Sequence, residues 1–143
     1  MRNSVALCLV VLLAAGCSQK EHSWSELEKE NSIHFYYSLE ASNAATVLSN
    51  DIAQGKQPRS NMSEVVSLRG IALEEANLVE DSVLLKAHDE LPQKFHNLYK
   101  KSLEYSIQAL ENDDNQASIR YSVLADQWGN WYRRNRRNIR IPK

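Results

Sequence analysis

The sequence predicts an all-α protein, an antiparallel up-down four-helix bundle that follows a cleaved N-terminal segment. Three observations support this fold class. Glycine and proline, which interrupt helices, occur only 4 and 3 times in 143 residues. Apolar residues recur every three or four positions over long stretches, which is the helical spacing. The polar breaks between these stretches are short, and short connectors favour antiparallel neighbours.

The N-terminal residues 1–16 have the properties of a signal peptide. Arg2 supplies a positive charge, and residues 5–15 (VALCLVVLLAA) are apolar throughout. A bilayer-spanning helix needs about 20 apolar residues, so this run is too short to span a membrane. The run ends in small residues directly before Cys17. This pattern is typical of the apolar region and cleavage end of a signal peptide.

Residues 13–17, Leu-Ala-Ala-Gly-Cys, resemble the lipobox of bacterial lipoproteins. The resemblance covers only the first 17 residues, and Leu13 stands four positions before the cysteine, where leucine more often stands three before. The resemblance implies cleavage between Gly16 and Cys17. It also implies a thioether-linked diacylglycerol on Cys17, often with a third, amide-linked chain.

These expectations predict the cellular location of the chain. Two or more acyl chains hold a protein stably on a membrane, so the chain is expected in the cell envelope, lipid-anchored to a membrane through Cys17. With Ser18 rather than Asp after the cysteine, the resemblance implies the outer membrane if the organism has two membranes. Residues 17–22 would be the lipidated tether. The other cysteine, Cys8, lies in the signal peptide, so the mature chain would have no disulfide.

The first helix is expected to begin near Ser23 or Ser25. Either Ser23 with Glu26 or Ser25 with Glu28 can form a capping box, in which hydroxyl and carboxylate satisfy early backbone N–H groups. Gly55 is well placed to end the helix in a left-handed cap. The apolar positions of this helix recur at helical spacing, with His34 on the same stripe: Leu27, Tyr37, Ala41, Ala44, Leu48 and Ile52.

A second helix is expected from Asn61, which with Glu64 can open it, to residue 87. Residues 88–92 (HDELP) form the next break. The apolar residues of this second helix recur every three or four positions: Val65, Leu68, Ala72, Ala76, Val79, Val83 and Ala87.

The third helix is expected to follow this break, and Pro92 is acceptable in a first helical turn but not within a helix. A polar turn at residues 112–115 (NDDN) then separates it from the fourth helix. The third helix carries Phe95, Leu98, Tyr99, Leu103, Ile107 and Leu110, and the fourth carries Ala117, Tyr121, Leu124, Trp128 and Trp131. We therefore expect a four-helix domain over residues 23–137 and a basic C-terminal tail over 138–143.

Charge is distributed unevenly along the chain. Residues 18–132 hold ten Lys or Arg and eighteen Asp or Glu, a net charge of −8, whereas residues 133–143 hold six cations, a net charge of +6. These cations could complement the negative end of a helix. They could equally bind anionic lipid, an acidic envelope protein or a cell-wall polymer. Nucleic acid fits the charge too, but an exported lipoprotein rarely meets it, so we expect no nucleic acid. The candidate interaction residues here are Arg133, Arg134, Arg136, Arg137 and Arg140.

A second candidate surface is the aromatic run at residues 34–37 (HFYY) in the first helix. Four consecutive residues point to all sides of a helix, so at least one ring should lie outside the core. Phe35 and Tyr36 are therefore candidate binding anchors. The alternative is a wide core stripe with tyrosine hydroxyls at its edge.

The remaining residue patterns predict neither a metal site, a cofactor nor an enzyme. No Glu-x-x-His pair occurs, and no Gly-x-Ser-x-Gly or phosphate-binding glycine loop is present. The expected function is that of a non-enzymatic envelope lipoprotein that acts through protein or surface interaction. The alternative is a ligand- or metal-binding sensor bundle, and pairing of two copies as a homodimer stays open. The four histidines are His22, His34, His88 and His96.

Overall fold

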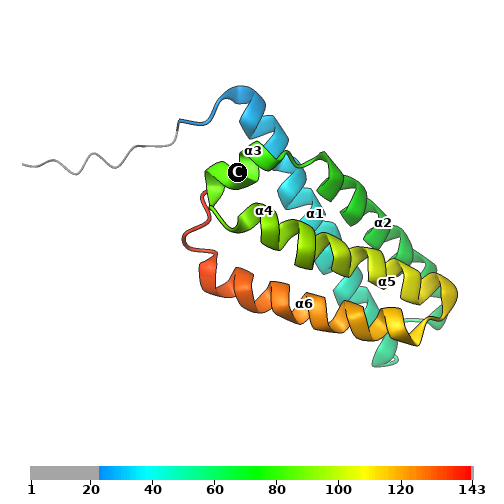
Figure 1. Cartoon of the computed structure of the whole chain (residues 1–143). Helices are drawn as coiled ribbons and strands as arrows, with labels where there is room; N and C mark the ends of the chain where they lie inside the picture. The colour runs from blue at the N-terminus through cyan, green and yellow to red at the C-terminus, as the bar shows by residue number, and fades with distance from the viewer. Residues whose placement is uncertain (1–22, 143) are drawn as a thin grey trace, which may run out of the picture.

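The computed structural model describes residues 23–142 of the chain (Figure 1). The expected signal peptide with Gly16, and the tether with Cys17, lie outside the described residues. Within residues 23–142 every regular element is a helix, which confirms the all-α fold class.

The helices pack lengthwise in a bundle-like arrangement. α1 (Glu26–Ala53) packs along α2 (Met62–Leu78), α2 packs against α5 (Lys101–Asn112), and α5 packs along α6 (Asn115–Asn135). Figure 1 shows these helices side by side, with the short helix α3 (Asp81–Ala87) at one end of them. None of the helices between residues 23 and 142 is both long and apolar enough to cross a lipid bilayer.

The ends of α1 are those that the sequence predicts. The Glu28 amide donates to Ser25 Oγ at 3.2 Å, and the Ser25 amide donates to Glu28 Oε2 at 2.7 Å, which completes a capping box. Beyond the other end, Gly55 has φ +72°, a left-handed conformation that glycine adopts without a steric penalty. A 3-10 turn, η1 (Arg59–Asn61), leads into α2.

The buried face of α1 differs from the predicted apolar stripe. Leu27 and Tyr37 are 64% and 51% exposed, and Ala44 is exposed as well. The reason is that small hydroxyl side chains face inward and satisfy their hydrogen bonds there. Ser38 Oγ, for example, donates to the Ala72 carbonyl of α2 at 2.6 Å. A hydrophobicity pattern assigns serine to the surface and so misses this face. The buried residues of α1 are Ser32, Phe35, Ser38 and Ala45.

The prediction of one continuous helix over residues 61–87 is wrong. The chain becomes extended at Val79 and Glu80, and α3 then starts in a new direction. The apolar spacing continues across this break, so periodicity alone does not reveal it. Turning the chain places Leu84 and Ala87 over the end of the core, where they are 0% and 5% exposed. Packing against the rest of the chain thus overrides the local helical preference.

The third predicted helix forms from Leu91 to Asn112, but it contains a wider turn. α4 (Leu91–Lys94) includes Pro92 in its first turn and leads into η2 (Phe95–Lys100), a π-helical segment, before α5 begins. A π turn inserts about one extra residue and shifts the phase of the side chains that follow. Phe95, Tyr99 and Leu103, spaced by four, are all buried.

The fourth helix, α6, also starts as predicted. Asp113 adopts a left-handed conformation with φ 51°, and Asp114 caps the helix. One carboxylate oxygen of Asp114 accepts from the Gln116 amide at 2.8 Å and from the Ala117 amide at 3.1 Å. These bonds hold the pKa of Asp114 below its usual value.

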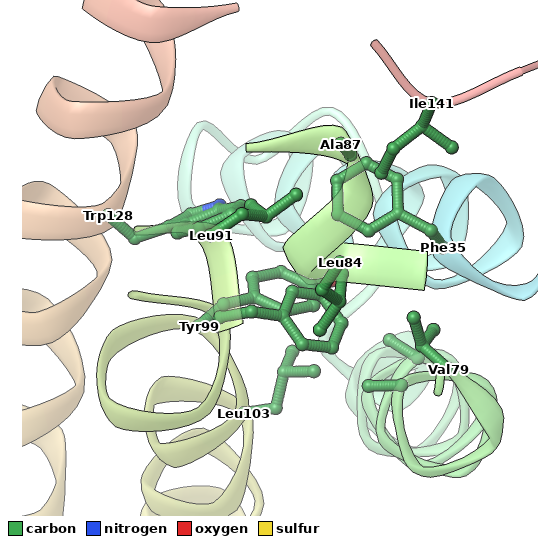
Figure 2. Packing of buried hydrophobic residues seen from close by; sticks show 12 residues of the cluster. Phe35, Val79, Leu84, Ala87, Leu91, Tyr99, Leu103, Trp128 and Ile141 are labelled. Atoms are coloured by element: carbon green, nitrogen blue, oxygen red, sulfur yellow. The ribbon is translucent and has the colours of Figure 1, made fainter. Parts of the chain in front are cut away.

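The core is a cluster of aromatic and aliphatic side chains contributed by every helix of the bundle. The rings of Tyr99 and Trp128 lie 5.1 Å apart, and those of Phe35 and Phe95 lie 5.5 Å apart. Figure 2 shows these side chains together, with Ile141 from the C-terminal segment beside Phe35. The cluster consists of Phe35, Ala72, Ala76, Val79, Leu84, Ala87, Leu91, Phe95, Tyr99, Leu103, Trp128 and Ile141.

We predict that Ile141 contributes to stability as a core residue. It is 7% exposed, so Ile141→Ala should leave a cavity and lower the free energy of unfolding by about 2 kcal/mol or more. Urea denaturation of both chains would measure the difference. Ile119, which is 58% exposed, provides the matched control, and Ile119→Ala should change stability by less than about 0.5 kcal/mol. Equal effects of the two substitutions would contradict the packing described for the C-terminal segment.

Candidate functional site

The C-terminal residues 136–142 fold back onto the helices. The Arg140 amide donates to the Ala87 carbonyl of α3 at 3.3 Å. From α1, Tyr36 donates its hydroxyl proton to the Ile141 carbonyl at 2.8 Å, and Ser32 donates to the Pro142 carbonyl at 3.0 Å. Residues 138–142 therefore pack as part of the helical domain, in place of the separate tail that we expected.

The five predicted arginines form an exposed group at this end of the molecule, which we call the arginine surface. All five side chains are exposed. Arg133 bonds to its own helix, through Nε to the Gly129 carbonyl and through Nη2 to Asn130 Oδ1. Within residues 23–142, no ion pair joins any of them to a carboxylate. Their charges are thus available to a partner. The arginine surface consists of Arg133, Arg134, Arg136, Arg137 and Arg140.

The two aromatic candidates lie next to the arginine surface, but Phe35 is not a surface anchor. Phe35 is 1% exposed and belongs to the core, because the inward face of α1 passes through this position. Tyr36 is partly buried, and burial raises its pKa. Both residues line a cleft of about 700 Å³ together with Arg136 and Arg137. The structure therefore brings four of the seven predicted interaction residues to one cleft.

The start of α1 lies at the same end of the molecule as the arginine surface. Lys86 of α3 donates to the Ser23 carbonyl at 2.9 Å and pairs with Glu28 at 2.7 Å. The Lys86 ammonium lowers the pKa of Glu28 and also lies over the Trp24 ring. The next residue, Ala87, accepts the backbone bond from Arg140. α3 thus holds the beginning and the end of the described chain close together (Figure 1).

A second site, which the sequence analysis missed, surrounds Arg69 of α2. Arg69 is 4% exposed, and no ion pair to a carboxylate exists for it within residues 23–142. A buried charge without a counter-charge costs several kcal/mol, so such an arginine is uncommon. One signal was present in the sequence: Arg69 interrupts the stripe between Val65 and Ala72 at helical spacing.

Four neutral oxygen atoms accept hydrogen bonds from the Arg69 guanidinium. Nη1 donates to the Ser42 carbonyl at 3.1 Å and to Ser42 Oγ at 2.8 Å. Nη2 donates to Thr46 Oγ1 at 2.9 Å and to the Tyr121 hydroxyl at 2.8 Å. Nε is buried and has no partner among the described residues. Arg69 therefore links α2 to α1 and α6, yet among residues 23–142 its Nε has no hydrogen-bond partner and its charge has no carboxylate partner.

A cavity of about 320 Å³, which we call the Arg69 cavity, lies beside this guanidinium. Besides Arg69, the lining combines hydroxyl groups and a side-chain amide with apolar side chains. Arg69 is the one charged side chain among the lining residues, so the lining has a positive charge. The lining residues are Leu39, Ser42, Asn43, Thr46, Arg69, Tyr99, Ser102, Tyr121, Ala125, Trp128 and Gly129.

The π-helical segment places Tyr99 in this lining. The Tyr99 hydroxyl lies 2.8 Å from Ser38 Oγ, and Ser38 gives its own proton to the Ala72 carbonyl, so Tyr99 donates to Ser38. Burial raises the pKa of Tyr99 to about 12, while the Ser38 and Ser42 hydroxyls and the Arg69 charge act in the opposite direction. At neutral pH the ring is an uncharged hydrogen-bond donor.

The described histidines do not form a metal site. His34 Nδ1 lies 2.6 Å from Glu75 Oε2, and His96 bonds to Asp81. Each pair contains a single carboxylate and lies apart from other ligand side chains. Between residues 23 and 142, no group of three or more histidine, cysteine or acidic residues could hold a metal ion.

We predict that Tyr99 makes stability depend on alkaline pH. Because folding raises the pKa of Tyr99 from 10.0 to about 12, the neutral form is favoured in the folded state. This contribution is complete below pH 10 and is lost as the pH rises through 12. The difference in unfolding free energy between the natural chain and Tyr99→Phe should therefore shrink between pH 9 and pH 12. Urea denaturation of both chains across this range measures it, and the other tyrosines cancel in the difference. A pH-independent difference would contradict the burial of this hydroxyl.

No protein-family model, curated protein or solved structure shows a significant match to this chain.

Proposed function

We propose that this protein is a lipid-anchored lipoprotein of the cell envelope without enzymatic activity, and that its arginine surface lies against an anionic membrane. One observation carries this proposal: the arginine surface and the start of α1 occupy the same end of the molecule, joined through α3. The lipobox resemblance at residues 13–17 supports the anchor. We also propose that the domain is an up-down antiparallel four-helix bundle, in which α3 interrupts the second connection.

The short distance along the chain between the proposed anchor and α1 supports this orientation. Ser23 follows Cys17 by six residues. An extended chain spans at most about 3.6 Å per residue, so a lipid on Cys17 would keep this end within about 20 Å of the membrane surface. At physiological ionic strength, charges interact strongly over about 8 Å. The tether therefore permits positions in which the arginine surface lies within that range.

The charge distribution supports the same orientation. Each cation near an anionic bilayer surface contributes about 1 kcal/mol, and the arginine surface has five arginines. Residues 18–132 carry a net charge of −8 and would be repelled from the same surface. The nearby carboxylate of Glu90 accepts a hydrogen bond from Trp131 and forms no ion pair with these arginines. The acidic body would therefore point away from the membrane. If the organism has two membranes, we propose that this membrane is the outer membrane.

We predict that Cys17 carries the lipid. Mass spectrometry of the natural chain should show a protein that begins at Cys17 and is heavier by a diacylglycerol and further acyl groups. Cys17→Ser removes the thiol that forms the thioether, so the chain should retain residues 1–16 and gain no lipid. An unlipidated natural chain that begins elsewhere would contradict the anchor.

We predict that four arginines hold this end against anionic lipid. The test uses the lipidated chain with Asn138→Cys, labelled with a fluorophore and reconstituted into vesicles that contain a headgroup quencher. Quenching should be strong in vesicles with phosphatidylglycerol, weak in pure phosphatidylcholine, and weaker at high salt. Replacing Arg133, Arg134, Arg136 and Arg137 with glutamine should largely abolish the quenching in anionic vesicles.

A matched control removes four exposed cations from other parts of the domain. Replacement of Lys56, Arg59, Lys101 and Arg120 with glutamine changes the net charge equally. Quenching should then remain as in the natural chain. Equal loss in both variants would show that only net charge matters, and quenching independent of lipid charge would overturn the proposed contact. In the second case the arginines would be free for an acidic envelope protein.

A further inference from the structure

We propose that the Arg69 cavity is a binding site for a small organic carboxylate. The proposal is independent of the lipid anchor and of the arginine surface, because the cavity is lined by residues of α1, α2, η2, α5 and α6. Its starting point is that a guanidinium with 4% exposure has neither a carboxylate partner nor a complete set of hydrogen bonds among the described residues. A ligand carboxylate would supply the missing counter-charge.

The lining also provides hydrogen-bond donors for such an anion. The Tyr121 hydroxyl accepts from Arg69, and within residues 23–142 the structure shows no acceptor for the hydroxyl's own proton. The side-chain amide of Asn43, an exposed residue, lines the same cavity and can donate to a ligand. Hydrogen bonds from neutral donors to an ionised acceptor are shorter and stronger than bonds between neutral groups. Arg69 thus contributes the positive charge, and the Tyr121 hydroxyl and the Asn43 side-chain amide contribute hydrogen-bond donors to the ligand.

The charge and the apolar part of the lining define the ligand class. With one cation and no other charged lining residue, a monoanion gives a neutral complex, whereas a phosphate dianion would bury a net negative charge. The volume of about 320 Å³ lies at the small end of the range for ligand sites. Leu39, Ala125 and Trp128 offer apolar contacts in the same cavity. A carboxylate attached to a small ring or short alkyl chain fits both parts.

Gly129 of α6 offers a way to close the cavity without disturbing the fold. It lines the cavity, and a Cβ atom added there would meet no atom within 4 Å. The Cβ atom of Gly129→Leu would therefore lie in open space, and leucine is a better helix former than glycine. Gly70 of α2 has equally open space but does not line the cavity, so Gly70→Leu is the matched control.

The test is calorimetric titration of the full chain in detergent with benzoate, benzamide and inorganic phosphate. Benzoate should bind, while benzamide, which has the same shape but no charge, and phosphate should bind at least tenfold more weakly. Arg69→Met should weaken benzoate binding by about tenfold or more, and Tyr121→Phe should weaken it less because the charge remains. Gly129→Leu should abolish benzoate binding, and Gly70→Leu should leave it unchanged.

Each of the contrary outcomes overturns the proposal. Absence of benzoate binding at millimolar concentration would show that the guanidinium is not available to a carboxylate. Equal binding of benzamide would show an apolar cavity in which Arg69 has no role. Phosphate binding as tight as that of benzoate would exclude the monoanion class, and unchanged benzoate binding in Gly129→Leu would place the carboxylate elsewhere on the chain. If Arg69→Met fails to fold, the Gly129→Leu and Gly70→Leu pair still decides the result.

Discussion

The hydrogen bonds of the buried Arg69 guanidinium are the interactions on which the polar contacts between α1, α2 and α6 depend. A charge of this kind requires acceptors from its neighbours, and two helices supply them: Ser42 and Thr46 from α1, and Tyr121 from α6. An arginine–carboxylate pair would have satisfied the charge inside the protein. Because neutral hydroxyls accept these hydrogen bonds instead of a carboxylate, the helices are held together while the Arg69 charge has no counter-charge among the described residues. The same group therefore serves both packing and the capacity to bind an anion.

The local boundaries of the helices could be predicted well from the sequence, since they depend on neighbouring residues. One of the two expected capping boxes, Ser25 with Glu28, is formed, as are the left-handed glycine after α1 and the polar turn before α6. The break between α2 and α3 could not be predicted in this way. Val79 is an ordinary helical residue by pattern, and its extended conformation is favoured by the burial of Leu84 and Ala87 against distant segments. Burial of that kind is a property of the whole fold.

The candidate sites were predictable to different degrees for a related reason. Clustered arginines are visible in the sequence, and they remain exposed in the structure as solvated charges commonly do. Phe35 was assigned to the wrong place because α1 turns its serines inward, which rotates the buried face away from the apolar stripe. Arg69 was overlooked because its neighbours in space come from α1 and α6. A single charged residue on an otherwise apolar stripe is the pattern that would have revealed it.

The helix break also explains why the two termini of the described chain meet. Had α2 continued straight, its last residues would have extended beyond the core, at 1.5 Å per residue, and left the end of the core open. As a separate helix, α3 covers that end, and its residues Lys86 and Ala87 bond to the two ends of the described chain. Lys86 bonds to Ser23 and to the Glu28 carboxylate at the start of α1, and Ala87 accepts the Arg140 amide. The position of the arginine surface beside the start of α1 thus follows from the packing of one short helix. A substitution that straightened the chain at Val79 and Glu80 would separate these elements even if every other helix were preserved.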